Sequence, residues 1–139
     1  MSKIIFAAVA VLSLAGPAAA EPRTVAPLDQ EVTIGGVGVG CTGIGQTKDD
    51  PKWAAYPVRI EFSNPAKEYL ADVDIDVATK AGRPLLSLSC EGAWVLLRLP
   101  PGAYAVRAKL NASKTPATTI PIRAPVHGQG RFVVVFPDN

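Results

Sequence analysis

The chain has 139 residues, of which 48% are hydrophobic, and its 14 Lys and Arg against 12 Asp and Glu give a formal net charge of +2. The basic residues are scattered along the chain, which argues against the clustered positive surface that nucleic-acid binding requires. A chain of this length and composition predicts one folded domain with its own hydrophobic core.

Residues 1–20 have the three-part organisation of a secretory signal peptide. Lys3 is the only charged residue among them, residues 4–16 form an apolar run, and residues 18–20 are alanines that offer a cleavage site. The run is shorter than the ~20 residues that span a membrane. We expect cleavage, a periplasmic or secreted location, and no stable membrane insertion afterwards. A buried N-terminal helix or an uncleaved anchor is the alternative.

Residues 21–31 are polar and contain prolines, so we expect a flexible leader before a folded domain at 32–139. Residues 35–51 hold half of the chain's twelve glycines, a density that predicts a long Gly-rich loop. Residues 38–43 match G-x-G-x-x-G, but dinucleotide binding also needs a strand before this motif and a helix after it. Residues 46–51 do not begin such a helix, so no nucleotide cofactor is expected.

From residue 56 onward, apolar and polar residues alternate with the period of a half-buried strand. The apolar runs lie at 58–62, 70–77, 85–88, 95–99, 104–110, 118–122 and 131–136. These seven or so short strands, separated by turn-forming residues, predict an all-β fold in which two sheets pack as a β-sandwich. An α+β fold with one helix near Trp53 is the alternative.

Residues 99–104 read Leu-Pro-Pro-Gly-Ala-Tyr and precede an alternating apolar run. Pro101 and Gly102 suit a type II turn, after which Tyr104 begins the return strand. Together with the stretches 35–38, 56–62, 69–76 and 80–82, this hairpin resembles carboxypeptidase regulatory-like domains of the transthyretin type, as found in small exported bacterial proteins. The resemblance implies a prealbumin-like or Ig-like sandwich without catalytic residues. Between Gly38 and Trp53 the chain departs from the family pattern.

Cys41 and Cys90 are the only two cysteines of the chain. In an oxidising compartment, two cysteines more often form a disulfide than bind a metal or act as a nucleophile. We therefore expect a Cys41–Cys90 disulfide. Two buried free thiols or an intermolecular bond are the alternatives.

Asp72, Asp74 and Asp76 recur at every second position, so on one strand they would share a face. They are a weak candidate for a cation site, although the spacing of the EF-hand calcium loop is absent. A solvated face with carboxylates paired across strands is the favoured interpretation, and no bound metal is expected. The candidate partners are Arg59, Arg107 and Lys109.

Two aromatic or titratable residues remain as functional candidates. Trp53 stands beside Lys52 at the end of the Gly-rich segment, where an exposed ring would bind a sugar or a partner protein. The alternative is that Trp53 caps the core.

His127 is the only histidine and lies in a predicted turn. The chain lacks a Gly-x-Ser-x-Gly elbow and has too few histidines for an ordinary catalytic zinc site, so no enzyme is expected.

These observations favour a non-enzymatic exported β-sandwich that binds a protein or a small ligand. A structural subunit that pairs its edge strands with another chain is the second hypothesis. A small hydrolase with an unrecognised site is the third.

Overall fold

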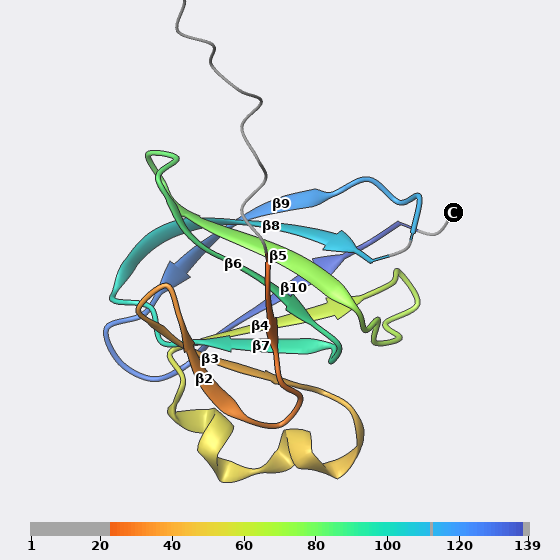
Figure 1. The fold of residues 1–139 in the computed structure, drawn as a ribbon, viewed down its shortest axis with the longest axis horizontal. Helices are drawn as coiled ribbons and strands as arrows, with labels where there is room; N and C mark the ends of the chain where they lie inside the picture. The colour runs from red at the N-terminus through yellow and green to blue at the C-terminus, as the bar shows by residue number, and fades with distance from the viewer. Residues whose placement is uncertain (1–22, 112, 138–139) are drawn as a thin grey trace, which may run out of the picture.

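The computed structural model describes residues 23–111 and 113–137, and it confirms the all-β sandwich (Figure 1). The signal peptide expected at residues 1–20 lies outside the described residues. Ten strands form two five-stranded sheets, which is three strands more than the alternation predicts. Neither helix of the described part is long and apolar enough to cross a membrane.

The first sheet has the strand order β1-β6-β5-β8-β9, and the second has the order β10-β4-β7-β3-β2. The first comprises β1 (Thr24–Ala26), β5 (Val73–Thr79), β6 (Pro84–Cys90), β8 (Gly102–Leu110) and β9 (Thr118–Ala124). The second comprises β2 (Glu31–Ile34), β3 (Val37–Thr42), β4 (Val58–Ser63), β7 (Trp94–Leu97) and β10 (Gly130–Val135). The pairs β1–β6 and β10–β4 are parallel, and all other pairs are antiparallel.

The core lies between the sheets because one face of each main strand is apolar. On β4, every second side chain is buried in the core, and these are Val58, Ile60 and Phe62. The facing residues of β5 are Val73, Ile75 and Val77. Full burial of one such side chain contributes about 1.5–3 kcal/mol of transfer free energy, so the alternating pattern stabilises the two-layer arrangement.

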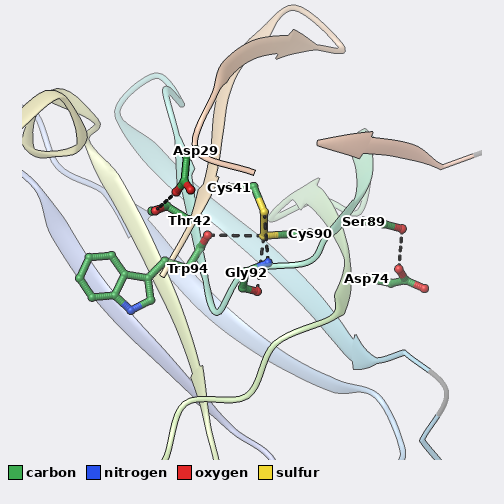
Figure 2. Close-up of a disulfide and its surroundings, with 8 residues drawn as sticks. All are labelled: Asp29, Cys41, Thr42, Asp74, Ser89, Cys90, Gly92 and Trp94. Carbon is green, nitrogen blue, oxygen red and sulfur yellow. Dashed lines mark hydrogen bonds between the residues drawn. A yellow bond between two sulfur atoms is a disulfide. The ribbon is translucent and has the colours of Figure 1, made fainter. Parts of the chain in front are cut away.

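The Cys41–Cys90 disulfide is present and connects the two sheets (Figure 2). Cys41 lies on β3 of the second sheet and Cys90 on β6 of the first, with their Cα atoms 5.7 Å apart. Both residues are buried in the core. The backbone N–H of Gly92 donates to the Cys41 Sγ at 3.4 Å. The bond therefore joins the two layers through the core.

The prediction of a long Gly-rich loop at 35–51 is wrong for its first half. Val37–Thr42 forms β3, which lies between β2 and β7 inside the second sheet. Val39 faces the core, whereas Gly38 and Gly40 face outward, where Arg98 and Trp53 lie directly on the strand. A Cβ at Gly38 would be 2.8 Å from Arg98 Cδ, and one at Gly40 would overlap the Trp53 ring. Glycine thus makes room for two large side chains.

The rest of that segment forms two short 3-10 helices, η1 (Gly45–Asp49) and η2 (Pro51–Ala55), drawn in gold at the bottom of Figure 1. The Asp50 carboxylate accepts a hydrogen bond from the Lys52 backbone N–H at 3.0 Å and caps η2. Trp53 and Tyr56 pack with Trp94 and other residues around β7 in a second hydrophobic cluster. The described residues contain no α-helix, so the α+β alternative is wrong.

The described part of the expected flexible leader is ordered. Thr24–Ala26 forms β1 and pairs with β6, and Ala26 is buried. Leu28 then bridges to Cys41 on the other sheet, and the Asp29 N–H donates to the Cys41 carbonyl at 2.7 Å. Backbone pairing, which the polar composition does not reveal, holds this segment to both sheets.

Candidate binding site

Each sheet ends in two edge strands, and these differ in how well they are protected. Natural proteins block edges with short strands, proline, lysine or bulges. β1 has three residues and β2 has four, and β9 contains Pro121. β10 has six residues, Gly130–Val135, which pair with β4 in continuous parallel register and include neither proline nor lysine. Among the described strands, β10 is the least protected edge.

The backbone of β10 presents its unpaired groups at three alternate residues. The N–H groups of Gly130 and Phe136 donate to the carbonyls of Pro57 and Ser63, both at 2.8 Å. Alternate residues of a parallel strand bond to the same neighbour. The N–H and C=O groups of Arg131, Val133 and Val135 therefore point away from β4, toward the open edge.

The same three residues also turn their side chains away from the core. Val133 is 42% exposed and Val135 is 48% exposed, whereas Val134 between them is fully buried. Together with Arg131 they form a surface strip, which we call the β10 strip. The strip thus combines free backbone groups with exposed aliphatic side chains.

A hollow of about 450 Å³ lies beside the β10 strip on the outer face of β4 and β10. Tyr69 and the turn at 64–67 form its wall, and the wall is fixed by backbone hydrogen bonds. The N–H of Lys67 donates to the Asn64 carbonyl at 3.0 Å, and Ser63 bridges to Tyr69. The lining residues are Glu61, Ser63, Asn64, Pro65, Lys67, Tyr69, Arg131, Val133 and Val135.

Glu61 is fully buried at the base of this hollow and is surrounded by donors. The Tyr69 hydroxyl donates to Oε1 at 2.8 Å, and Arg131 Nη2 donates to the same oxygen at 3.1 Å. Oε2 accepts a hydrogen bond from Arg59 Nε at 3.1 Å and another from Arg131 Nε. Both carboxylate oxygens therefore accept hydrogen bonds, and Glu61 and Arg131 form a bidentate ion pair.

Burial alone would raise the pKa of the Glu61 carboxyl. The hydrogen bonds from Arg131 and Tyr69, and the charge of Arg59, outweigh that effect and hold the pKa below its ordinary value of 4.5. An ionised carboxylate whose lone pairs are already engaged is a poor proton acceptor. Its role here is to orient Arg131, whose side chain is 57% exposed at the mouth of the hollow.

Aromatic contacts connect the hollow to the second hydrophobic cluster. The Arg59 guanidinium lies over the Trp94 ring at 4.2 Å from the centroid. Tyr69 meets the same ring edge-on, with centroids 6.0 Å apart. A cation over an indole and an edge-to-face pair are both attractive arrangements. Trp94 therefore positions two of the donors to Glu61.

Trp53 does not provide the exposed binding surface that was one of its two predicted roles. The residue is 2% exposed, and its indole N–H donates to the Thr47 carbonyl at 2.8 Å. The ring covers the outer face of β3 at Gly40, with the Lys52 ammonium 4.6 Å from its centroid. Trp53 is a packing residue, although it caps the outside of one sheet and not the end of the sandwich.

The three predicted aspartates do not share one face. Asp72 precedes β5 and is exposed with a φ of 61°. Asp74 and Asp76 do share the outer face, where they accept hydrogen bonds from Ser89 and Ser87, both at 2.6 Å. Within residues 23–111 and 113–137, no group of three or more His, Cys, Asp or Glu side chains is placed to hold a metal ion.

The ion pairs of this face differ in part from those expected. Asp76 pairs with Arg107 at 3.6 Å, as predicted, and with Arg23 at 2.9 Å, which was not predicted. Arg59 lies on the other sheet with Glu61.

His127 is exposed in the turn between β9 and β10 and is not among the residues that line the hollow.

Glu61, Tyr69 and Arg131 were not predicted from the sequence as site residues. Arg59 and Glu61 read as ordinary polar positions of an alternating strand, and 70 residues separate Glu61 from Arg131. The parallel β10–β4 pairing brings Arg59 opposite Arg131, and nothing local in the sequence signals that pairing.

No protein-family model matches the chain, and no curated protein matches it. The resemblance to carboxypeptidase regulatory-like domains therefore stays a prediction, and the sandwich fold by itself does not identify a family. The functional interpretation rests on the residues of the hollow and the β10 strip.

Proposed function

We propose that the chain is a non-enzymatic binding module that adds an extended segment of a protein partner to β10. The observation that carries the proposal is the β10 strip itself. Its three residues present unpaired backbone groups to the edge, and its two valines are exposed beside a hollow. Backbone bonds to a sheet edge supply affinity in such recognition, and neighbouring pockets supply specificity.

The hollow defines the chemistry of the partner segment. Val133 and Val135 offer an aliphatic surface, while Arg131 and Lys67 bring positive charge to the same hollow. The single carboxylate there, Glu61, is buried and already paired. The segment that fits is extended and alternately apolar, with an acidic side chain that reaches Arg131 or Lys67.

We place this activity in an oxidising compartment outside the cytoplasm. The support is the buried Cys41–Cys90 disulfide, since cytosolic proteins rarely keep such a bond. The signal-peptide pattern of residues 1–20 supports the same location.

The proposal can be tested by selecting peptides that bind the purified protein from a displayed random library. Calorimetry with synthetic copies of the selected peptides then measures their affinity. We expect alternately apolar, acidic peptides. Val133→Pro removes a backbone donor at the open edge, so it should abolish binding. Thr33→Lys is the matched control, because Thr33 is exposed on β2, the other edge of the same sheet. It should leave the affinity unchanged.

Amide hydrogen exchange then shows which backbone N–H groups of β10 are free and which are hydrogen-bonded. In the free protein, the amides of Arg131, Val133 and Val135 should exchange fast, while that of Val134 should be protected. The selected peptide should slow exchange at the three residues of the strip. Peptides that bind Val133→Pro as tightly as the native protein, or that protect β2 instead, contradict the proposal. A dimer that forms through β10 without peptide would favour the assembly hypothesis.

A further inference from the structure

A second hollow, of about 400 Å³, lies where β8 and β9 of the first sheet meet β10 of the second. Its residues come from β8 and the edge strand β9 of the first sheet, from the edge strand β10 of the second, and from the turn after β5. They are Lys80, Ala103, Tyr104, Pro121, Ile122, Arg123 and Phe132. We call it the seam cleft. Its volume falls within the ~300–1,000 Å³ of typical small-molecule sites.

The aromatic walls of the seam cleft are held in place by the fold. The Tyr104 hydroxyl donates to the Pro100 carbonyl at 2.7 Å across the Pro101–Gly102 turn. The Phe132 ring lies against Gly130, where a Cβ would be 3.0 Å from the ring. The Leu-Pro-Pro-Gly-Ala-Tyr hairpin singled out in the sequence thus fixes one wall, and a glycine makes room for the other. The cleft is therefore formed before any ligand binds.

The charges of the seam cleft all have one sign. Lys80 and Arg123 are both exposed, and no carboxylate is among the residues that line the cleft. The other lining residues are aliphatic or aromatic. An apolar floor with a purely cationic rim is complementary to a molecule that carries an anionic group on an apolar body.

We infer that the seam cleft binds a small amphipathic anion, such as an aliphatic or aromatic carboxylate. The apolar body lies against Tyr104 and Phe132, and the carboxylate meets Arg123 and Lys80 at the rim. No residue lines both the seam cleft and the hollow beside the β10 strip, so this inference does not rest on the proposed strand addition.

Octanoate and 1-octanol are the probes, since they share an alkyl chain and differ in charge. Nuclear magnetic resonance titrations of the purified protein should shift the amides of Ala103, Arg123 and Phe132. We expect octanoate to bind about tenfold more tightly than octanol, because a charged hydrogen bond is stronger than a neutral one. Arg123→Gln and Lys80→Gln should each weaken octanoate binding by about threefold.

Arg83→Gln is the matched control, since Arg83 is exposed in the same β5–β6 turn as Lys80 but does not line the cleft. It should leave the octanoate affinity unchanged. Equal affinity for octanol and octanoate would overturn the inference, as would shifts confined to another surface. The absence of saturable octanoate binding up to about 10 mM would also overturn it. The titration of the unaltered protein needs no variant, so misfolding of a variant leaves the test intact.

Discussion

The Cα of Gly40 lies directly beneath the indole ring of Trp53, with no room between them for a methyl group. This contact joins β3 to the η2 helix, and it explains why a strand inside the second sheet carries glycine. Trp53 belongs to the second hydrophobic cluster with Tyr56 and Trp94. Trp94 in turn contacts Arg59 and Tyr69, so the packing on Gly40 extends to the donors around Glu61.

Gly40→Ala should therefore destabilise the protein. A methyl group at this position forces the Trp53 ring away from β3, and overpacking of this kind costs about 1–3 kcal/mol. Chemical denaturation measures the loss of unfolding free energy. The same substitution in a Trp53→Leu background should cost much less, because the smaller side chain leaves space. Equal costs in the two backgrounds would show that the ring is not the obstacle.

Removal of the disulfide should lower stability more than any surface change. The bond closes a loop across a sequence separation of 49 residues. Loss of that constraint on the unfolded chain corresponds to about 4 kcal/mol. The comparison is between the native protein and Cys41→Ala/Cys90→Ala in urea, with a thiol reductant added in parallel. A double variant as stable as the oxidised protein would contradict the proposed stabilising role.

Glu61→Gln should destabilise the fold and weaken its pH dependence. Charged hydrogen bonds each contribute about 1.5–3 kcal/mol, but the Arg131 side chain is 57% exposed. Water screening reduces the expected loss at neutral pH to about 1–2 kcal/mol. Glu68→Gln is the control, because Glu68 is exposed and its carboxylate accepts one hydrogen bond, from the Asn64 side-chain amide at 3.3 Å. It should change stability by less than about 0.5 kcal/mol.

The sign of the pH effect follows from the lowered pKa of Glu61. Its stabilising contribution is complete above the unfolded-state pKa, whose ordinary value is 4.5, and is lost as pH falls through the lower folded-state pKa. The pKa of Asp76 is also lowered: burial opposes this shift, and hydrogen bonds from Arg23 and Ser87 outweigh it. Native stability should therefore fall in acid, and Glu61→Gln should show a shallower fall. Parallel pH profiles for the two proteins would contradict this assignment.

The sandwich was predictable because the signal of a half-buried strand is local. Val58, Ile60 and Phe62 alternate with polar residues in consecutive sequence, so their shared face needs no tertiary information. The disulfide followed from the count of cysteines and their expected compartment. The local pattern fails at β3. Val39 faces the core and Gly40 faces outward, as on any strand, but the many glycines of this segment indicate a loop. Glycine is needed at position 40 because the Trp53 ring packs on it, and Trp53 lies in a different segment of the chain.

The candidate site was not predictable for a related reason. Its central contact is between Glu61 and Arg131, which lie on β4 and β10 and meet through a parallel pairing. Parallel strands need a long connection, so no hairpin turn marks the register. The open edge of β10 is likewise a property of the sheet order, which the alternation of Val133, Val134 and Val135 leaves undetermined.

Proline substitutions at Val133 and Val134 should lower stability by very different amounts, although the two residues are adjacent. The Val133 N–H points to the open edge, so Val133→Pro removes no ladder bond and should cost about 1 kcal/mol, the typical cost of a point substitution. The Val134 N–H points to β4, and Val134→Pro should cost about 3 kcal/mol or more. Denaturation of both variants measures the contrast. Equal, severe losses would show that Val133 is bonded within the fold and that β10 has no free edge to offer a partner.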